Sequence, residues 1–152
     1  MNMVRIRKGV FSAAYVLLIL ANAGCKKEPL LSDIPEIELL ATGPTAVTEF
    51  EDSIVFEISY RDGNGDLGEN DQDAENLFVK DNRIGIIQPY RIQELAPTGT
   101  DIAIQGKLNV ILENTGITDG SAQQTATFDI WVRDRAGNQS NVVTSPGILI
   151  SR

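Results

Sequence analysis

The chain contains no histidine, one cysteine and one tryptophan among its 152 residues. Without histidine it lacks the commonest general base and metal ligand, and a single cysteine excludes a disulfide within the chain. Basic residues are also few, with 13 Lys and Arg against 21 Asp and Glu. Such an acidic chain repels nucleic acid and favours cations, neutral sugars or basic partners. The sequence has no nucleophile elbow or phosphate loop, so we expect no enzymatic activity.

The first feature that is present is an apolar segment near the N-terminus. Arg5, Arg7 and Lys8 precede an apolar run over residues 10–21, and small residues follow it. A basic start, a short apolar middle and small residues at the cut predict a secretory signal peptide over residues 1–24. A single-pass membrane anchor is the alternative, but a membrane span needs ~20 apolar residues and this run is shorter.

The single cysteine, Cys25, directly follows those small residues. The sequence Ala23-Gly24-Cys25 resembles the lipobox of bacterial lipoproteins, which implies that Cys25 is lipidated as the first residue of the mature chain. Two or three acyl chains make a durable membrane anchor, whereas one chain binds only marginally. Lys26-Lys27-Glu28 resembles the short sorting signal of Bacteroidota lipoproteins, which implies a lipid anchor in the outer membrane. Whether the domain faces the periplasm or the cell surface stays open.

The mature chain divides into a polar tether over residues 25–35 and one domain over residues 36–152. In the domain, apolar residues recur with a period of two, as in Ile54, Phe56 and Ile58. This period is typical of half-buried strands, and no window has a helical period. Seven strands separated by turn signals predict an all-β fold, an antiparallel two-sheet sandwich. The expected strands are 36–40, 53–60, 77–80, 84–88, 102–112, 125–133 and 142–150, the last interrupted by Pro146-Gly147.

The sixth expected strand and the turn after it carry a second resemblance. The sequence Asp134-Arg135-Ala136-Gly137-Asn138 resembles the Asp-x-Ala-Gly-Asn turn of bacterial immunoglobulin-like domains. With the Gly-rich acidic loop after the second strand, the mature domain resembles small, mostly uncharacterised Bacteroidota lipoproteins. The resemblance implies an immunoglobulin-like sandwich and an outer-membrane location. It implies no particular activity, because one sandwich fold carries many functions.

An acidic loop follows the second expected strand. Asp62, Asn64 and Asp66 occupy alternate positions, and this spacing turns oxygen-bearing side chains to one side of the loop. The backbone carbonyl of Gly68 and the carboxylate of Asp73 are further candidate ligands. Calcium takes about six to eight oxygen ligands in a flexible cage, so the loop predicts a calcium site on a β scaffold. The alternative is a glycine-rich turn in which Asp and Asn satisfy their own backbone.

The expected topology adds two residues to this metal site. In an immunoglobulin-like sandwich the loops after the second and sixth strands emerge at the same end. Asp134 and Asn138 are therefore expected beside Asp62. The alternative roles are a salt bridge from Asp134 to Arg135 or Arg61 and a left-handed turn conformation for Asn138.

Trp131 is the candidate ligand-binding residue. Its parity in the sixth expected strand is opposite to that of Phe128, Ile130 and Val132, which places it on an outer sheet face. Exposed aromatic side chains stack on sugar rings or anchor protein partners. The alternative is that a neighbouring loop covers the ring, since large aromatic area is seldom left bare.

Two functions follow from these features. The first is a surface-anchored, non-enzymatic binding module, stabilised by calcium, for a glycan or an envelope protein. The second is a structural accessory protein of an envelope complex with no ligand of its own.

Overall fold

The computed structural model of the chain describes residues 31–152. The expected signal peptide, Cys25 and the first part of the tether lie outside the described residues. Within the described range, no helix has the length and apolar character needed to cross a membrane.

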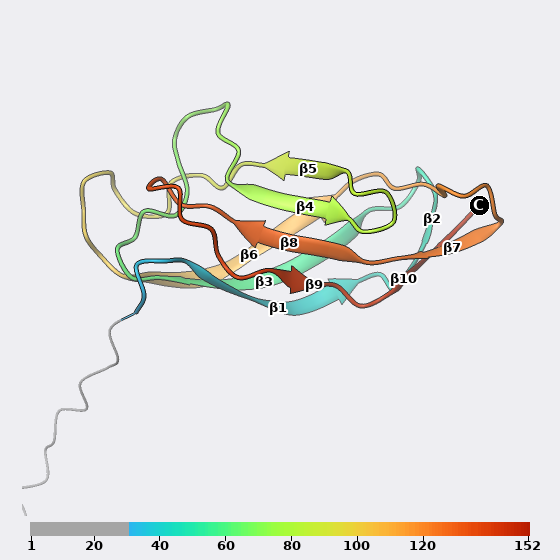
Figure 1. The fold of residues 1–152 in the computed structure, drawn as a ribbon, viewed down its shortest axis with the longest axis horizontal. Helices are drawn as coiled ribbons and strands as arrows, with labels where there is room; N and C mark the ends of the chain where they lie inside the picture. The colour runs from blue at the N-terminus through green and yellow to red at the C-terminus, as the bar shows by residue number, and fades with distance from the viewer. Residues whose placement is uncertain (1–30) are drawn as a thin grey trace, which may run out of the picture.

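The described chain is all-β, as the period-two pattern predicts. Ten strands form three sheets, with the orders β1-β3-β6, β5-β4-β8-β9 and β2-β10-β7 (Figure 1). The strands are β1 (Glu36–Gly43), β2 (Ala46–Thr48), β3 (Ile54–Asp62), β4 (Leu77–Asp81), β5 (Ile87–Tyr90), β6 (Ile104–Leu112), β7 (Gln123–Ala126), β8 (Phe128–Val132), β9 (Val143–Thr144) and β10 (Ile148–Ser151).

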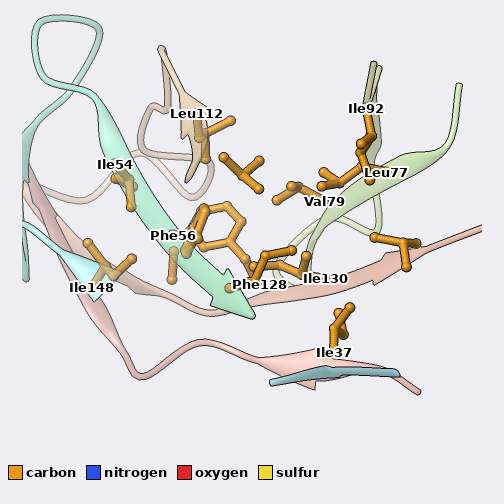
Figure 2. Close-up of a cluster of buried hydrophobic side chains, with 14 of the residues drawn as sticks. Ile37, Ile54, Phe56, Leu77, Val79, Ile92, Leu112, Phe128, Ile130 and Ile148 are labelled. Atoms are coloured by element: carbon orange, nitrogen blue, oxygen red, sulfur yellow. The ribbon is translucent and has the colours of Figure 1, made fainter. Parts of the chain in front are cut away.

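The β1-β3-β6 and β5-β4-β8-β9 sheets are antiparallel and enclose the core of a β-sandwich. Along β3 and β8 every second side chain is buried, because successive side chains in a strand point to opposite faces. Phe56 of β3 and Phe128 of β8 meet with ring centroids 5.6 Å apart. Figure 2 shows them among Leu112 of β6, Val79 of β4 and Ile130 of β8.

Two details of the strand prediction were wrong. A third sheet is present, in which β2 pairs with β10 in parallel. The strand expected at 84–88 begins only at Ile87, because Gly85 adopts a positive φ of 73° and its N–H closes a turn onto the Asp81 carbonyl. The interruption expected at Pro146-Gly147 is confirmed, because β9 and β10 lie on either side of it and Pro146 has no N–H to continue the ladder. The immunoglobulin-like assignment within the sandwich class stays a prediction.

Strand register decides which loops meet. Asp62 at the end of β3 pairs with Ile104, and Val132 at the end of β8 pairs with Leu77. The loops that follow β3 and β8 therefore leave the sandwich at one end, on the left in Figure 1. We call this the acidic end.

Candidate functional site

The loops after β3 and β8 contact each other at the acidic end. The backbone N–H of Arg135 donates to the carbonyl of Asp66 at 3.2 Å, and the Arg135 guanidinium donates to the carbonyl of Gly68 at 2.7 Å. The prediction that these two loops lie together is confirmed.

A third loop, between β5 and β6, forms a wall that the sequence analysis missed. Gly65 and Gly68 have φ values of 71° and 86°, and a Cβ at either position would collide with the backbone carbonyl of Ile102 or Gln93. Only glycine combines this conformation with so close an approach of two backbones. The glycines of the acidic loop therefore hold it against the β5–β6 loop, and the sequence offered no local signal for that partner.

Three carboxylates lie near enough where the loops meet for their charges to act on one another, and we call Asp62, Asp66 and Asp134 the acidic cluster. Asp62 is fully buried and Asp134 is 6% exposed. The Oδ2 atom of Asp62 accepts a hydrogen bond from the N–H of Leu67 at 2.8 Å. Its Oδ1 atom, and Oδ1 of Asp66, are buried without a hydrogen-bond partner. A buried acceptor without a donor costs free energy, so these two oxygens call for an explanation.

The charges of the cluster act on one another. Burial, and then the neighbouring charge of Asp134, raise the pKa of Asp62, against an opposing effect of its bond from Leu67. Burial, Asp134 and Asp62 raise the pKa of Asp66 in the same way. Both causes disfavour the ionised form. The nearby Arg135 only partly offsets them, because its guanidinium donates to the carbonyls of Gly65 and Gly68.

The other predicted ligands are engaged with groups of the protein or exposed. The Asn138 backbone N–H and side-chain amide donate to the two oxygens of Asp134, at 2.7 and 2.9 Å, so Asn138 orients that carboxylate. Asn64 Oδ1 accepts from the N–H of Asp66 at 3.3 Å, and the Gly68 carbonyl accepts from Arg135. Asp73 is exposed, and its N–H bonds the Asp71 carboxylate.

Two further observations bear on the predicted metal site. As the described residues stand, no three acidic, His or Cys side chains converge closely enough to hold an ion. The salt bridge considered for Asp134 is also absent from the described part of the chain. Arg61, the other nearby cation, instead pairs with Glu36 at 3.5 Å and Glu38 at 3.1 Å.

Trp131 lies on the outer face of its sheet, as its parity predicts. It is half-buried and stacks on Phe78 of the neighbouring strand, with ring centroids 5.4 Å apart and planes 14° from parallel. The Arg133 guanidinium lies 5.2 Å from the centre of the same Phe78 ring. This packing occupies one face of the indole, and a role in ligand binding stays a prediction.

A hollow between edge strands β5 and β6 was not predicted. Its apolar part, of about 220 Å³, lies among Leu77, Ile92 and Leu108. Across Tyr90 it adjoins a wider hollow of about 580 Å³. The polar side chains of the wider part are Gln88, Asn109, Glu113 and Asn114. These residues come from separate strands, so no single stretch of sequence reveals the hollow.

Comparisons with protein-family models, curated proteins and solved structures found no match to this chain.

Proposed function

We propose that the mature chain is a lipid-anchored binding module that is stabilised by calcium and has no enzymatic activity. The observation that carries the calcium part is the pair of buried, unpartnered oxygens on Asp62 and Asp66 beside the buried Asp134. A divalent cation satisfies those oxygens and neutralises the crowded charges. A plain turn leaves both oxygens unexplained.

The donors at the acidic end favour calcium over other metals. They are carboxylate, amide and backbone carbonyl oxygens, which suit hard cations, and no imidazole or thiolate is present among them. The donors sit on loops, and calcium tolerates the variable geometry that loops provide, whereas magnesium requires a near-ideal octahedron.

The test is unfolding of the lipid-free chain in chelator and in calcium. Binding to the folded form alone stabilises it by ~2.7 kcal/mol when free calcium is a hundredfold above its dissociation constant. Extracellular modules bind calcium at ~0.1 to 1 mM, so the titration extends to about 10 mM. Asp66→Asn and Asp134→Asn are expected to remove most of the stabilisation. Asp119→Asn is the matched control, because Asp119 is exposed and lies in the loop before β7.

A domain equally stable in chelator and in calcium would contradict the calcium proposal. It would favour the structural accessory role, in which the acidic loop is only a turn.

The hollow between β5 and β6 supports the binding part of the proposal. Amide groups of Gln88, Asn109 and Asn114 each offer a donor and an acceptor, beside the ring of Tyr90. Pockets of this kind combine apolar walls with a few placed polar groups. The lining carries little net charge, so it suits a neutral glycan or a polar segment of an envelope protein.

Binding to a glycan array and co-purification from native membranes test this part, with Asn109→Ala and Trp131→Ala compared. We expect Asn109→Ala to weaken binding at unchanged stability, since Asn109 is exposed. Trp131→Ala is expected to cost ~1 to 2 kcal/mol of stability through its lost stacking on Phe78. Weakened binding in the Trp131 variant alone would indicate that the ligand binds at Trp131 on the outer sheet face and not in the hollow.

The proposed location is the outer membrane, reached through lipidation of Cys25. Its support is the sequence of the signal segment, because Cys25 lies outside the described residues.

A further inference from the structure

The segment that joins the domain to its tether contacts the acidic loop directly. We call residues 31–37 the entry segment. The N–H of Gly63 donates to the carbonyl of Ser32 at 2.7 Å. A Cβ at Gly63 would lie 2.5 Å from the carbonyl oxygen of Leu31. The entry segment therefore packs backbone against backbone on the residue between Asp62 and Asn64.

The other loop of the acidic cluster holds the same segment. The N–H of Ile37 donates to the Asn141 side chain at 2.9 Å, and the Asn141 amide donates back to the Ile37 carbonyl at 2.8 Å. Asn141 follows the loop of Asp134 and is fixed beside Ser140, whose hydroxyl accepts from the N–H of Val132. In Figure 1 the blue start of the described chain lies at the end where β3 and β8 finish.

The entry segment thus bridges the two loops that supply the acidic cluster. Without a cation, like charges on Asp62, Asp66 and Asp134 push these loops apart. Any such displacement acts on the Gly63–Ser32 bond, since Gly63 is adjacent to Asp62, and on the Asn141–Ile37 bonds, since Asn141 ends the segment that begins at Asp134. A cation that draws the carboxylates together removes this repulsion and so stabilises the same hydrogen bonds.

We propose that calcium at the acidic cluster locks the entry segment onto the sandwich, so that the ion controls how rigidly the domain is held on its tether. The proposal rests on the calcium site proposed above. It assigns that site a role in orienting the module relative to the membrane, beyond stabilising the fold. By thermodynamic linkage the effect is reciprocal, and docking of the entry segment tightens calcium binding by the same factor.

Amide hydrogen exchange on the lipid-free chain, with and without calcium, tests the first half. The Gly63 amide is the reporter, because its acceptor is the Ser32 carbonyl. The Asp81 amide is the control, since it donates to the Ile86 carbonyl in a turn at the opposite end of the sandwich. We expect calcium to slow exchange of the Gly63 amide about tenfold or more and to change the Asp81 amide much less. An equal change at both amides, or none at Gly63, would overturn the proposal.

The reciprocal half is tested by calcium affinity. Asn141→Ala removes both bonds to Ile37 and leaves every carboxylate in place. Asn82→Ala is the matched control, because Asn82 is exposed, its amide also makes two side-chain hydrogen bonds, to Thr127 and Asp129, and it lies at the opposite end, in the turn after β4. We expect the Asn141 variant to bind calcium about fivefold more weakly, the lower range of typical couplings, and the control to match the parent chain. Equal affinities in both variants would refute the coupling.

The outcomes separate this inference from the proposed function. If calcium changes neither melting nor exchange, the calcium site itself fails. If calcium raises the melting temperature but leaves the exchange rate of the Gly63 amide unchanged, the calcium site is supported and the coupling to the entry segment is refuted.

Discussion

The two ends of the sandwich bury carboxylates in different ways. At the end opposite the acidic cluster, Asp81 is 8% exposed and pairs with Arg83, whose Nη2 lies 2.6 Å from its Oδ2. The same guanidinium donates to Thr115, to the Gly116 carbonyl and to Gln124. At the acidic end three carboxylates gather, and the guanidinium of Arg135 bonds backbone carbonyls instead.

The two ends differ in what supplies the positive charge that balances their buried carboxylates. Arg83 is a cation of the chain itself, planar and rich in donors, so a residue of the protein balances the charge of Asp81. Among the described residues no Lys or Arg side chain forms a salt bridge with Asp62, Asp66 or Asp134, and in the proposed function a calcium ion from solution supplies the opposing charge. In the proposed function, one end therefore contributes stability that does not require calcium, whereas the stability of the other end responds to calcium.

The largest expected effect is the loss of the fixed cation. Arg83→Met leaves the Asp81 carboxylate buried without its partner and removes the bonds to Thr115 and Gln124. Breaking one partner of a buried pair costs ~3 to 5 kcal/mol, measured here by urea unfolding. The loss is expected to be equal in chelator and in calcium.

The control is Lys107→Met, since Lys107 pairs with Glu57 at the surface and such pairs contribute little. A loss for the Arg83 variant no larger than for this control would contradict the role given to the Asp81–Arg83 pair.

The next effect changes sign with calcium. Asp62→Asn keeps an acceptor for the Leu67 N–H and replaces the unpartnered oxygen with a donor. In chelator we expect a gain of about 1 kcal/mol, because one of three repelling charges is removed. In calcium the variant is expected to be less stable than the parent chain, since the ion loses a ligand. Urea unfolding in both conditions measures the change, and a loss of stability in chelator would show that Asp62 is not strained by its neighbours.

The sequence predicts the acidic end better than the opposite end for a physical reason. Alternating Asp and Asn in a glycine-rich loop is a local pattern, and the sandwich topology alone brings Asp134 to Asp62. The pairing of Asp81 and Arg83 closes a turn whose other partners, Thr115 and Gln124, lie far along the chain. Such contacts depend on side-chain packing across three segments, which periodicity does not encode.

The same reason explains the other differences. The two-residue period of apolar side chains identifies the strands, whereas the strand ends depend on turns such as the one at Gly85. The wall that Ile102 and Gln93 form against the acidic loop, and the hollow beside Tyr90, arise only when separate loops and strands are assembled.

The smallest expected effect is a difference in pH dependence between the two ionic conditions. The pKa values of Asp62 and Asp66 are raised in the folded state above the ordinary value of 3.8. A raised carboxyl pKa means that the folded form binds protons more tightly than the unfolded form. Its contribution to stability is therefore present below about pH 3.8 and is lost as the pH rises through the raised folded values.

In chelator, acidification from neutral pH toward about pH 4 is expected to reduce the charge repulsion within the acidic cluster and stabilise the domain. In calcium the trend is the reverse, because protons compete with the ion for the same oxygens. Urea unfolding at several pH values in each condition measures both trends, and Asp62→Asn, which removes one of the titrating groups, is expected to flatten them. Parallel curves in chelator and in calcium would show that the acidic end, like the Asp81–Arg83 end, carries its own balance of charge.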